Sequence, residues 1–347
     1  MSIQENMFGS LEKALSQFEG PVLIVSSAVG AGNISIGEAV RQRLANQEVS
    51  HFQIERFLPA AAVEEDNHRY KFISNHFNFL LHAIYRVPFF YQRKLFREEH
   101  VRRTDLSLLA NEIKRGGYRT VIAVSHRQAF WLSLLKKRKQ GVFQLYGVLT
   151  EFGTNLGWRY LLWDEIDGFI SPLPKDALCL PFSQKLRFIK APLLYKKEYA
   201  DLAGYKGKRD KVLFVAGFWG QVSWRKAVYL VERLLNAFEH LQVTVVCGTN
   251  QKLFNIFVRS LGTHPRLTIF GQSDSLCEMM KECASIITKP GFSTLVEAHA
   301  ACRQIFLLKG MPVAEEHNAS YALSHFGAKR FSVREFGRWY LSYQTEG

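Results

Sequence analysis

The sequence has few cysteines, no metal-ligand motif and no long apolar run. Its five cysteines are scattered, and none forms the C-x-x-C pair typical of zinc sites and redox motifs. This odd count and spacing argue against a disulfide framework and favour reduced thiols in the cytosol. No apolar run approaches the roughly 20 residues that a membrane-spanning helix needs, and residues 1–20 lack the basic start and apolar stretch of a secretory signal. These absences favour a cytoplasmic, soluble protein.

The chain instead carries a surplus of positive charge. Its 347 residues include 45 Lys+Arg against 31 Asp+Glu, a formal net charge of +14. Such a surplus favours polyanionic partners: nucleic acid, an anionic lipid surface or phosphorylated ligands. No RNA- or DNA-binding signature accompanies the charge, so nucleic acid is the least favoured of the three.

Short β-branched apolar runs alternate with helical stretches along the chain. This alternation predicts parallel sheets covered by helices on both faces, and the length allows two domains. A stretch rich in proline, glycine and lysine, within residues 172–211, separates two such series. We predict an α/β fold of two Rossmann-like doubly wound domains, 1–190 and 191–330, with 331–347 packing back on the first. The predicted strands are 21–27, 120–124, 142–149, 168–171, 212–217, 243–247, 267–270, 285–288 and 304–308, and the predicted helices include 38–46, 226–240 and 251–261.

Glycine turns follow four of the predicted strands. In an open parallel sheet, ligands bind outside the carboxyl ends of the strands, where glycine lets the backbone approach a phosphate. None of the turns completes a G-x-G-x-x-G or P-loop motif, so tight turns without a ligand stay open as an alternative for each. The turns contain Gly30 and Gly32, Gly217 and Gly220, Gly271, and Gly291.

The most specific stretch is residues 286–298. A predicted strand ends at Thr288, turns through Lys-Pro-Gly, and a helix begins at Ser293 or Thr294. The free N–H groups of a helix start can hold a phosphate. Glu297 lies one turn into this helix, where its carboxylate can accept hydrogen bonds from two ribose hydroxyls. One strand later, residues 312–318 (PVAEEHN) form a predicted polar loop suited to sugar hydroxyls, with a solvated acidic loop as the alternative.

These two segments together resemble the donor half of glycosyltransferase family 28. Within that family, the nearest likeness is to processive diacylglycerol glucosyltransferases and monogalactosyldiacylglycerol synthases. Three more segments agree with the family pattern: residues 26–33 (SSAVGAGN) resemble its S-x-x-x-G-x-G-H opening, 150–158 (TEFGTNLGW) its T-D-F/Y-x-x-H-x-x-W loop, and 246–250 (VCGTN) its C-G-x-N strand end. The resemblance extends from residue 21 to about residue 326.

The resemblance implies a GT-B architecture with a cleft between the domains and a UDP-sugar as donor substrate, with no cofactor and no metal. It implies that Glu297 binds ribose and that the backbone around Phe270 and Gly271 meets the uracil. The implied diphosphate contacts are Gly217, Gly220, Gly291, Ser293 and Thr294 with charge from Lys289, and the implied sugar contacts are Glu315, Glu316 and Asn318.

Three positions depart from the family pattern. Asn33 and Asn155 stand where relatives have histidine, and Glu151 stands where they have aspartate. An amide can hydrogen-bond a hydroxyl but cannot take its proton near neutral pH. Either Glu151 or His126 is therefore the base, or the protein has lost or changed its transfer activity; of the two bases we favour Glu151. Bulky rings in residues 216–221 (AGFWGQ) also imply altered donor geometry or identity.

Residues 72–103 mix aromatic with basic side chains, which suits a segment lying on an anionic bilayer. The alternative is a core helix with a solvated face. With the Gly30 and Gly32 loop, this segment forms the predicted acceptor and membrane surface, centred on Phe89, Phe90, Arg93 and Lys94.

The sequence thus predicts a glycosyltransferase that is cytoplasmic and peripheral on the inner face of the membrane. It would move a hexose from a UDP-sugar to a diacylglycerol-like lipid or another hydrophobic acceptor. A nucleotide-sugar-binding protein with lost or altered transferase activity is the alternative, because asparagine occupies both histidine positions. A nucleotide-sugar epimerase shares the architecture, but the acceptor-loop match favours transfer.

Overall fold

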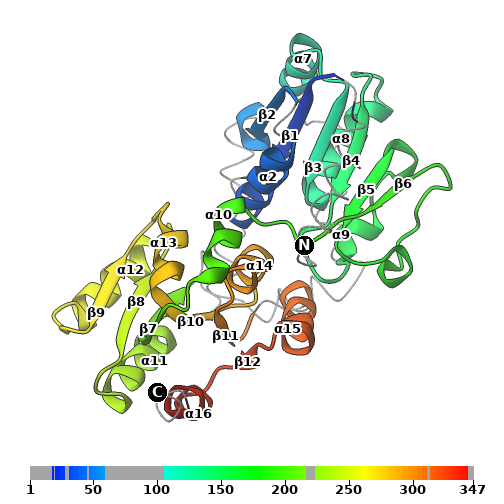
Figure 1. Cartoon of the computed structure of the whole chain (residues 1–347). Helices are drawn as coiled ribbons and strands as arrows, with labels where there is room; N and C mark the ends of the chain where they lie inside the picture. Colours follow the sequence, from blue (N-terminus) through cyan, green and yellow to red (C-terminus); the bar gives the residue numbers. More distant parts are fainter. Residues whose placement is uncertain are drawn as a thin grey trace. The chain divides into compact units, whose positions relative to one another are not determined.

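The computed structural model describes residues 18, 20–27, 31–44, 47–58, 105–215, 223–310 and 313–342. Its internal contacts separate two compact units, which divide between Lys196 and Lys197. Each unit contains one six-stranded parallel sheet with helices between its strands (Figure 1).

The first sheet has the strand order β2-β1-β3-β4-β5-β6, and all its neighbours are parallel. Its central strands β1 and β3 read VLIVS and TVIAV and are buried along their whole length, as strands covered on both faces are. The strands are β1 (Val22–Ser26), β2 (Val49–Gln53), β3 (Thr120–Val124), β4 (Gln144–Val148), β5 (Gly168–Ser171) and β6 (Arg187–Lys190). The helices and 3-10 turns are α2 (Ala31–Arg43), η1 (Ile54–Phe57), α7 (Ser107–Arg115), α8 (His126–Lys137), α9 (Leu156–Arg159), η2 (Trp163–Glu165) and η3 (Lys175–Leu178).

The order in which the chain adds strands to this sheet changes direction between β1 and β3. From β1 it moves to β2 on one side, and then crosses to β3 on the other side of β1. Because parallel crossovers are right-handed, α2 and α8 cover opposite faces. The carboxyl ends of β1 and β3 therefore form a switch point, where ligands bind in open α/β sheets.

The second sheet has the order β12-β11-β10-β7-β8-β9, again with parallel neighbours throughout. By the same argument, its switch point lies between β7 and β10. The strands are β7 (Lys208–Val215), β8 (Gln242–Val246), β9 (Leu267–Phe270), β10 (Cys283–Thr288), β11 (Gln304–Leu307) and β12 (Lys329–Arg330). The helices and turns are α10 (Lys197–Ala200), η4 (Asp201–Gly204), α11 (Trp224–Ala237), α12 (Gln251–Leu261), α13 (Leu276–Glu282), α14 (Phe292–Ala300), α15 (Ala314–His325) and α16 (Val333–Ser342).

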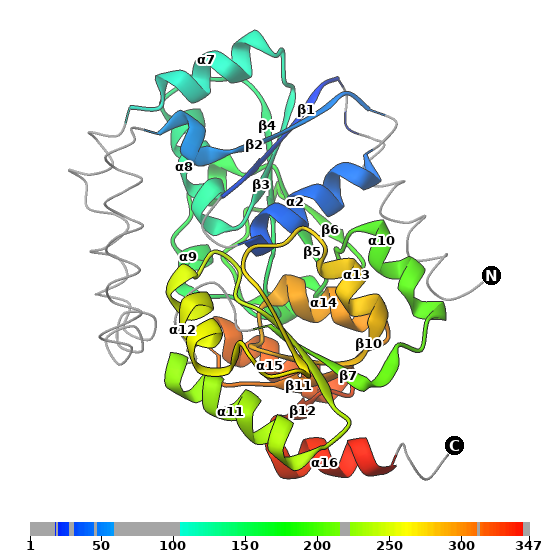
Figure 2. The ribbon, with the colours of Figure 1, turned by 90° about the vertical axis from the view of Figure 1, so that its left-hand side faces the viewer.

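The predicted fold class is confirmed, since both units are doubly wound parallel α/β sheets. The final helix differs from its prediction. Residues 331–347 were expected on the first domain, but α16 contacts α11, beside which Figure 2 draws it, and its apolar stripe of Phe336, Trp339 and Tyr340 enters the second unit's core. In the described parts of the chain, no helix is long and apolar enough to cross a membrane.

Candidate functional site

The carboxyl end of β1 carries two buried serines that hydrogen-bond to β2 and to η1. The Ser26 hydroxyl lies 2.9 Å from His51 Nε2 on β2, and the Ser27 hydroxyl donates to the Glu55 carboxylate in η1. Desolvation lowers the pKa of His51, which favours its neutral form. The last residues before the first glycine loop are therefore fixed by hydrogen bonds to β2 and η1.

The carboxyl end of β3 contains a strained backbone. Ser125, between β3 and α8, has φ 96° and ψ 164°, a region that is essentially open only to glycine. Its hydroxyl donates to Gln128 Oε1, and both residues are buried. This conformation makes the sharp turn from which His126 begins α8.

Glu151, Asn155 and His126 come together beside this turn. Asn155 Nδ2 lies 3.0 and 3.2 Å from the two Glu151 carboxylate oxygens and 3.4 Å from His126 Nδ1. Asn155 Oδ1 accepts from the N–H groups of Gly157 (2.8 Å) and Trp158 (3.4 Å) and so caps α9. The second-loop asparagine thus links the two candidate bases.

His126 is neutral at physiological pH. Desolvation by the surrounding atoms, with a smaller effect of the Arg127 charge, lowers the pKa of His126 to about 4. Its ring packs edge-to-face with the buried Trp158 indole, with the ring centroids 5.9 Å apart. A neutral histidine and a half-buried carboxylate therefore both contact the NH₂ group of one amide.

Two buried donors near this cluster have no hydrogen-bond partner among the described residues. They are Gln128 Nε2 and Trp158 Nε1. An unsatisfied buried donor costs about 1–3 kcal/mol, so such groups are uncommon and call for an explanation. Sequence reasoning included Trp158 in the 150–158 motif but did not identify Gln128, and it predicted neither unpaired donor, because no local pattern distinguishes an unpaired donor from a paired one.

The remaining predicted residues of the first unit are only partly described. Gly32 and Asn33 occupy the first turn of α2, where Asn33 is half-buried. The other predicted acceptor and membrane residues lie outside the described residues: Gly30, Phe89, Phe90, Arg93 and Lys94.

In the second unit, the segment from β10 to α14 forms the predicted strand-turn-helix. Gly291 is the N-cap residue, and α14 begins at Phe292, one or two residues before the predicted start at Ser293 or Thr294. The N–H groups of the first turn, those of Ser293 and Thr294 included, have no acceptor within the helix. A Cβ on Gly291 would come no closer than 3.8 Å to any neighbouring atom outside the adjacent residues. Packing within the protein therefore does not explain the glycine, whereas close approach of a ligand would.

The predicted sugar residues lie against the same turn, but they form a helix and not a loop. Glu315 and Glu316 are in the first turn of α15. The Lys289 ammonium pairs with the Glu315 carboxylate, and Asn318 Nδ2 donates to the Pro290 carbonyl at 3.1 Å. These contacts bring α15 to the carboxyl end of β10.

Glu297, the predicted ribose residue, is 3% exposed in α14. Burial raises the pKa of Tyr199 on α10, and the Glu297 charge nearby raises it further. Glu297 is therefore buried within the second unit, on a helix that contacts α10.

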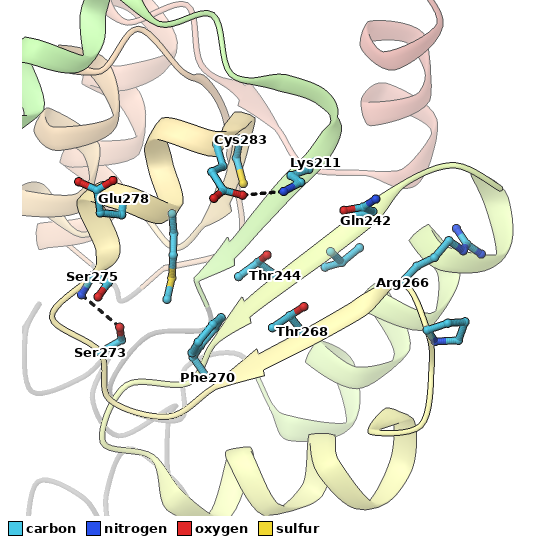
Figure 3. Close-up of a pocket in the computed structure, with 14 residues that line it drawn as sticks. Lys211, Gln242, Thr244, Arg266, Thr268, Phe270, Ser273, Ser275, Glu278 and Cys283 are labelled. Carbon is cyan, nitrogen blue, oxygen red and sulfur yellow. Dashed lines mark hydrogen bonds and ion pairs between the residues drawn. The ribbon is translucent and has the colours of Figure 1, made fainter.

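A cavity of about 470 Å³ lies against the β8–β9 edge and α13 (Figure 3). The paired strand residues Thr244 and Thr268 line it, and Phe270, 37% exposed, lies at the carboxyl end of β9. Of the predicted donor residues, Phe270 alone belongs to this cavity, and Gly271 follows in the next turn. The predicted uracil contacts therefore border this cavity, whereas the described diphosphate and sugar candidates are not part of its lining.

The first glycine loop of the second unit, with Gly217 and Gly220, lies outside the described residues. Within the described ranges, no group of three or more His, Cys, Asp or Glu side chains is placed to hold a metal ion.

The fold is that of the GT-B glycosyltransferases. The chain superposes on the crystal structure of MurG from Acinetobacter baumannii with a TM-score of 0.53, at 13% identity over 94% of this chain and 91% of that one. At this identity, the likeness shows the fold alone.

The sequence is similar to processive diacylglycerol β-glucosyltransferases, as its motifs predicted. The relatives from Bacillus cereus and Bacillus thuringiensis are each 29% identical over 206 residues, 54% of this chain. The chain aligns with about half the length (50%) of these curated relatives. No protein-family model matches it.

Proposed function

We propose that this protein transfers a hexose from a UDP-sugar to a diacylglycerol-like lipid or another hydrophobic acceptor. The observation that carries the proposal is the β10–α14 turn, where the most specific motif lies at the switch point of the second sheet. Similarity to diacylglycerol glucosyltransferases supports the substrate class. The second unit would hold the donor and the first unit the acceptor.

The donor side offers positive potential without a metal. A helix start has a partial positive charge and free N–H groups, which together suit a diphosphate. Lys289 adds a full charge beside Gly291, and its pairing with Glu315 holds it there. Glu315 and Asn318 would contact the hexose from α15, with Glu316 at the exposed side of the same helix turn.

The acceptor side contains two side chains that can accept a proton, Glu151 and His126. In the transfer, the acceptor hydroxyl oxygen bonds to the anomeric carbon, the bond from that carbon to UDP breaks, and the hydroxyl proton must leave. Asn33 and Asn155 cannot accept a proton. Burial lowers the pKa of His126 to about 4, so this histidine is no stronger a base than an ordinary carboxylate, and Glu151 stands where the family pattern has its aspartate. Glu151 is the group we propose as the base.

A nucleotide-sugar-binding protein without transferase activity is the second candidate. It is favoured by one observation, the asparagines at positions 33 and 155. It would keep UDP binding and lose transfer.

Two measurements test these proposals. Calorimetry with UDP should show binding that Glu297→Ala weakens by about 1.5–3 kcal/mol, because hydrogen bonds from two ribose hydroxyls to a charged group are lost. Unchanged affinity in the folded variant would overturn the donor assignment. Purified protein incubated with radiolabelled UDP-sugars and lipid extract should yield a labelled lipid; binding without any product would favour the second candidate.

A further inference from the structure

The cap on α9 fixes the orientation of the Asn155 amide. Its oxygen accepts from two backbone N–H groups, those of Gly157 and Trp158. A flipped amide would point its NH₂ group at those donors and lose both bonds. Nδ2 is therefore the atom that faces Glu151 and His126.

This orientation determines the direction of the other hydrogen bonds. Nδ2 has two hydrogens and no acceptor capacity. One hydrogen points to the Glu151 carboxylate, whose oxygens lie at 3.0 and 3.2 Å, and the other points to His126 Nδ1 at 3.4 Å. His126 Nδ1 must then be unprotonated, so the proton of the neutral ring is on Nε2. All polar atoms of Asn155 are satisfied within the protein.

Unfavourable local features gather around the same histidine. Ser125 holds a backbone conformation that costs about 1–3 kcal/mol. Gln128 Nε2 and Trp158 Nε1 are buried donors without a partner in the described chain. Such features persist where the surrounding structure enforces them, and they concentrate at functional sites.

We propose that Asn155 is a positioning residue for transfer, which holds the Glu151 carboxylate toward the reaction and keeps the His126 proton on Nε2. This inference rests on the proposed function, because it assigns proton removal to Glu151. An imidazole at position 155 has only two ring nitrogens and could not both cap α9 and donate two hydrogen bonds. Compared with the histidine of the family pattern, Asn155 cannot accept a proton, but it can hold the Glu151 carboxylate by a hydrogen bond.

Variants that keep the cap separate positioning from folding. Asn155→Ser retains a good N-cap but loses the donor to Glu151, and Asn155→Asp retains the cap and shape but turns a carboxylate toward Glu151. Asn155→Ser should unfold close to the parent temperature, and Asn155→Asp at a lower temperature because its carboxylate faces that of Glu151. Both should remain folded under assay conditions and bind UDP as the parent does. Asn155→Ser should lower kcat roughly 10–10²-fold with little change in the donor KM, since misplaced reacting groups lose about that much. Asn155→Asp should lower kcat at least as far.

Unchanged kcat in both folded variants would overturn the proposal. A second readout does not need activity: nitrogen NMR of the parent should show His126 protonated at Nε2, and the Asn155 side-chain amide protons should exchange slowly, faster in Glu151→Ala. A His126 ring protonated at Nδ1, or fast exchange of the Asn155 amide protons in the parent, would refute the proposed hydrogen bonds of Asn155. If the parent transfers no sugar over the donor panel, the proposed function fails and the positioning proposal fails with it, while NMR still decides the geometry.

Discussion

At the scale of single residues, Glu151 is the carboxylate on which the proposed chemistry depends. We predict that Glu151→Gln keeps UDP affinity but lowers transfer by roughly 10²–10⁴-fold, the usual loss on removing a general base. Transfer assays and UDP calorimetry on the same preparation measure both. Glu112→Gln is the matched control, because Glu112 pairs with Arg115 on α7 outside the candidate site and should leave transfer unchanged. Full transfer by Glu151→Gln would assign the base elsewhere.

His126 makes stability depend on pH. Its folded pKa of about 4 is below the ordinary value of 6.5, so between these values the unfolded chain binds the proton more readily. The contribution of His126 to the free energy of unfolding is constant above pH ~6.5. As pH falls toward 4, up to about 3 kcal/mol of it is lost. Lowered pKa values of His51 and His299 act with the same sign. Urea unfolding at pH 7 and pH 4.5 should show a smaller loss in His126→Gln, and an identical loss would contradict the prediction.

The sequence identified the candidate residues individually, but it did not predict the contacts among them. Glu151, Asn155 and His126 were each identified from sequence, and the structure places the three together. The cap was a missed signal, since asparagine before a short helix is a favoured N-cap. Ser125 gave no signal at all, because a positive φ at a serine follows from the fold around it.

At the scale of elements, the glycines flanking Glu315 allow a paired test. A Cβ on Gly310 would lie 2.7 Å from Glu315 Cβ and from Pro290, whereas a Cβ on Gly291 would have ordinary contacts. We predict that Gly310→Ala lowers the free energy of unfolding by about 1–3 kcal/mol. Gly291→Ala should leave it nearly unchanged and weaken UDP binding, because the methyl group occupies the expected diphosphate position. Denaturant unfolding and UDP calorimetry on both variants check this. Equal stability of the two variants would contradict the packing argument.

The buried strands and the edge strand β9 were predicted from sequence, whereas the edge strands β2, β6 and β12 were not. Long apolar runs identified β1, β3 and β10, which are buried throughout. β2 and β6 read VSHFQ and RFIK, lie at the edges of their sheet and are partly exposed, so they lack a continuous apolar run. β12 has two residues, too few for any pattern.

At the scale of the whole molecule, the positive surplus should act at a membrane surface. In the described chain, α11 exposes Trp224 and Tyr229, with Arg225 and Arg233 over their rings at 4.9 and 5.9 Å. Aromatic and basic groups together suit an anionic interface. We predict salt-sensitive cosedimentation with vesicles containing phosphatidylglycerol, weakened by up to roughly 30-fold in Arg225→Gln/Arg233→Gln at roughly 1 kcal/mol per charge. Lys114→Gln/Lys137→Gln, which removes the same charge from α7 and α8, is the control. Equal weakening in both pairs would indicate a diffuse charge effect.

The absence of a metal requirement is the last whole-molecule prediction. A diphosphate leaving group carries negative charge that some transferases neutralise with a divalent cation held by carboxylates. This sequence has no Asp-x-Asp motif, and the described residues contain no cluster suited to a metal ion. We propose that this charge is met by the start of α14 and by Lys289, which pairs with Glu315. Transfer should therefore persist in EDTA, while Lys289→Gln should lower it roughly 10-fold or more and weaken UDP binding. Loss of transfer on chelation, with recovery on adding Mg²⁺ or Mn²⁺, would show that a metal supplies this charge instead.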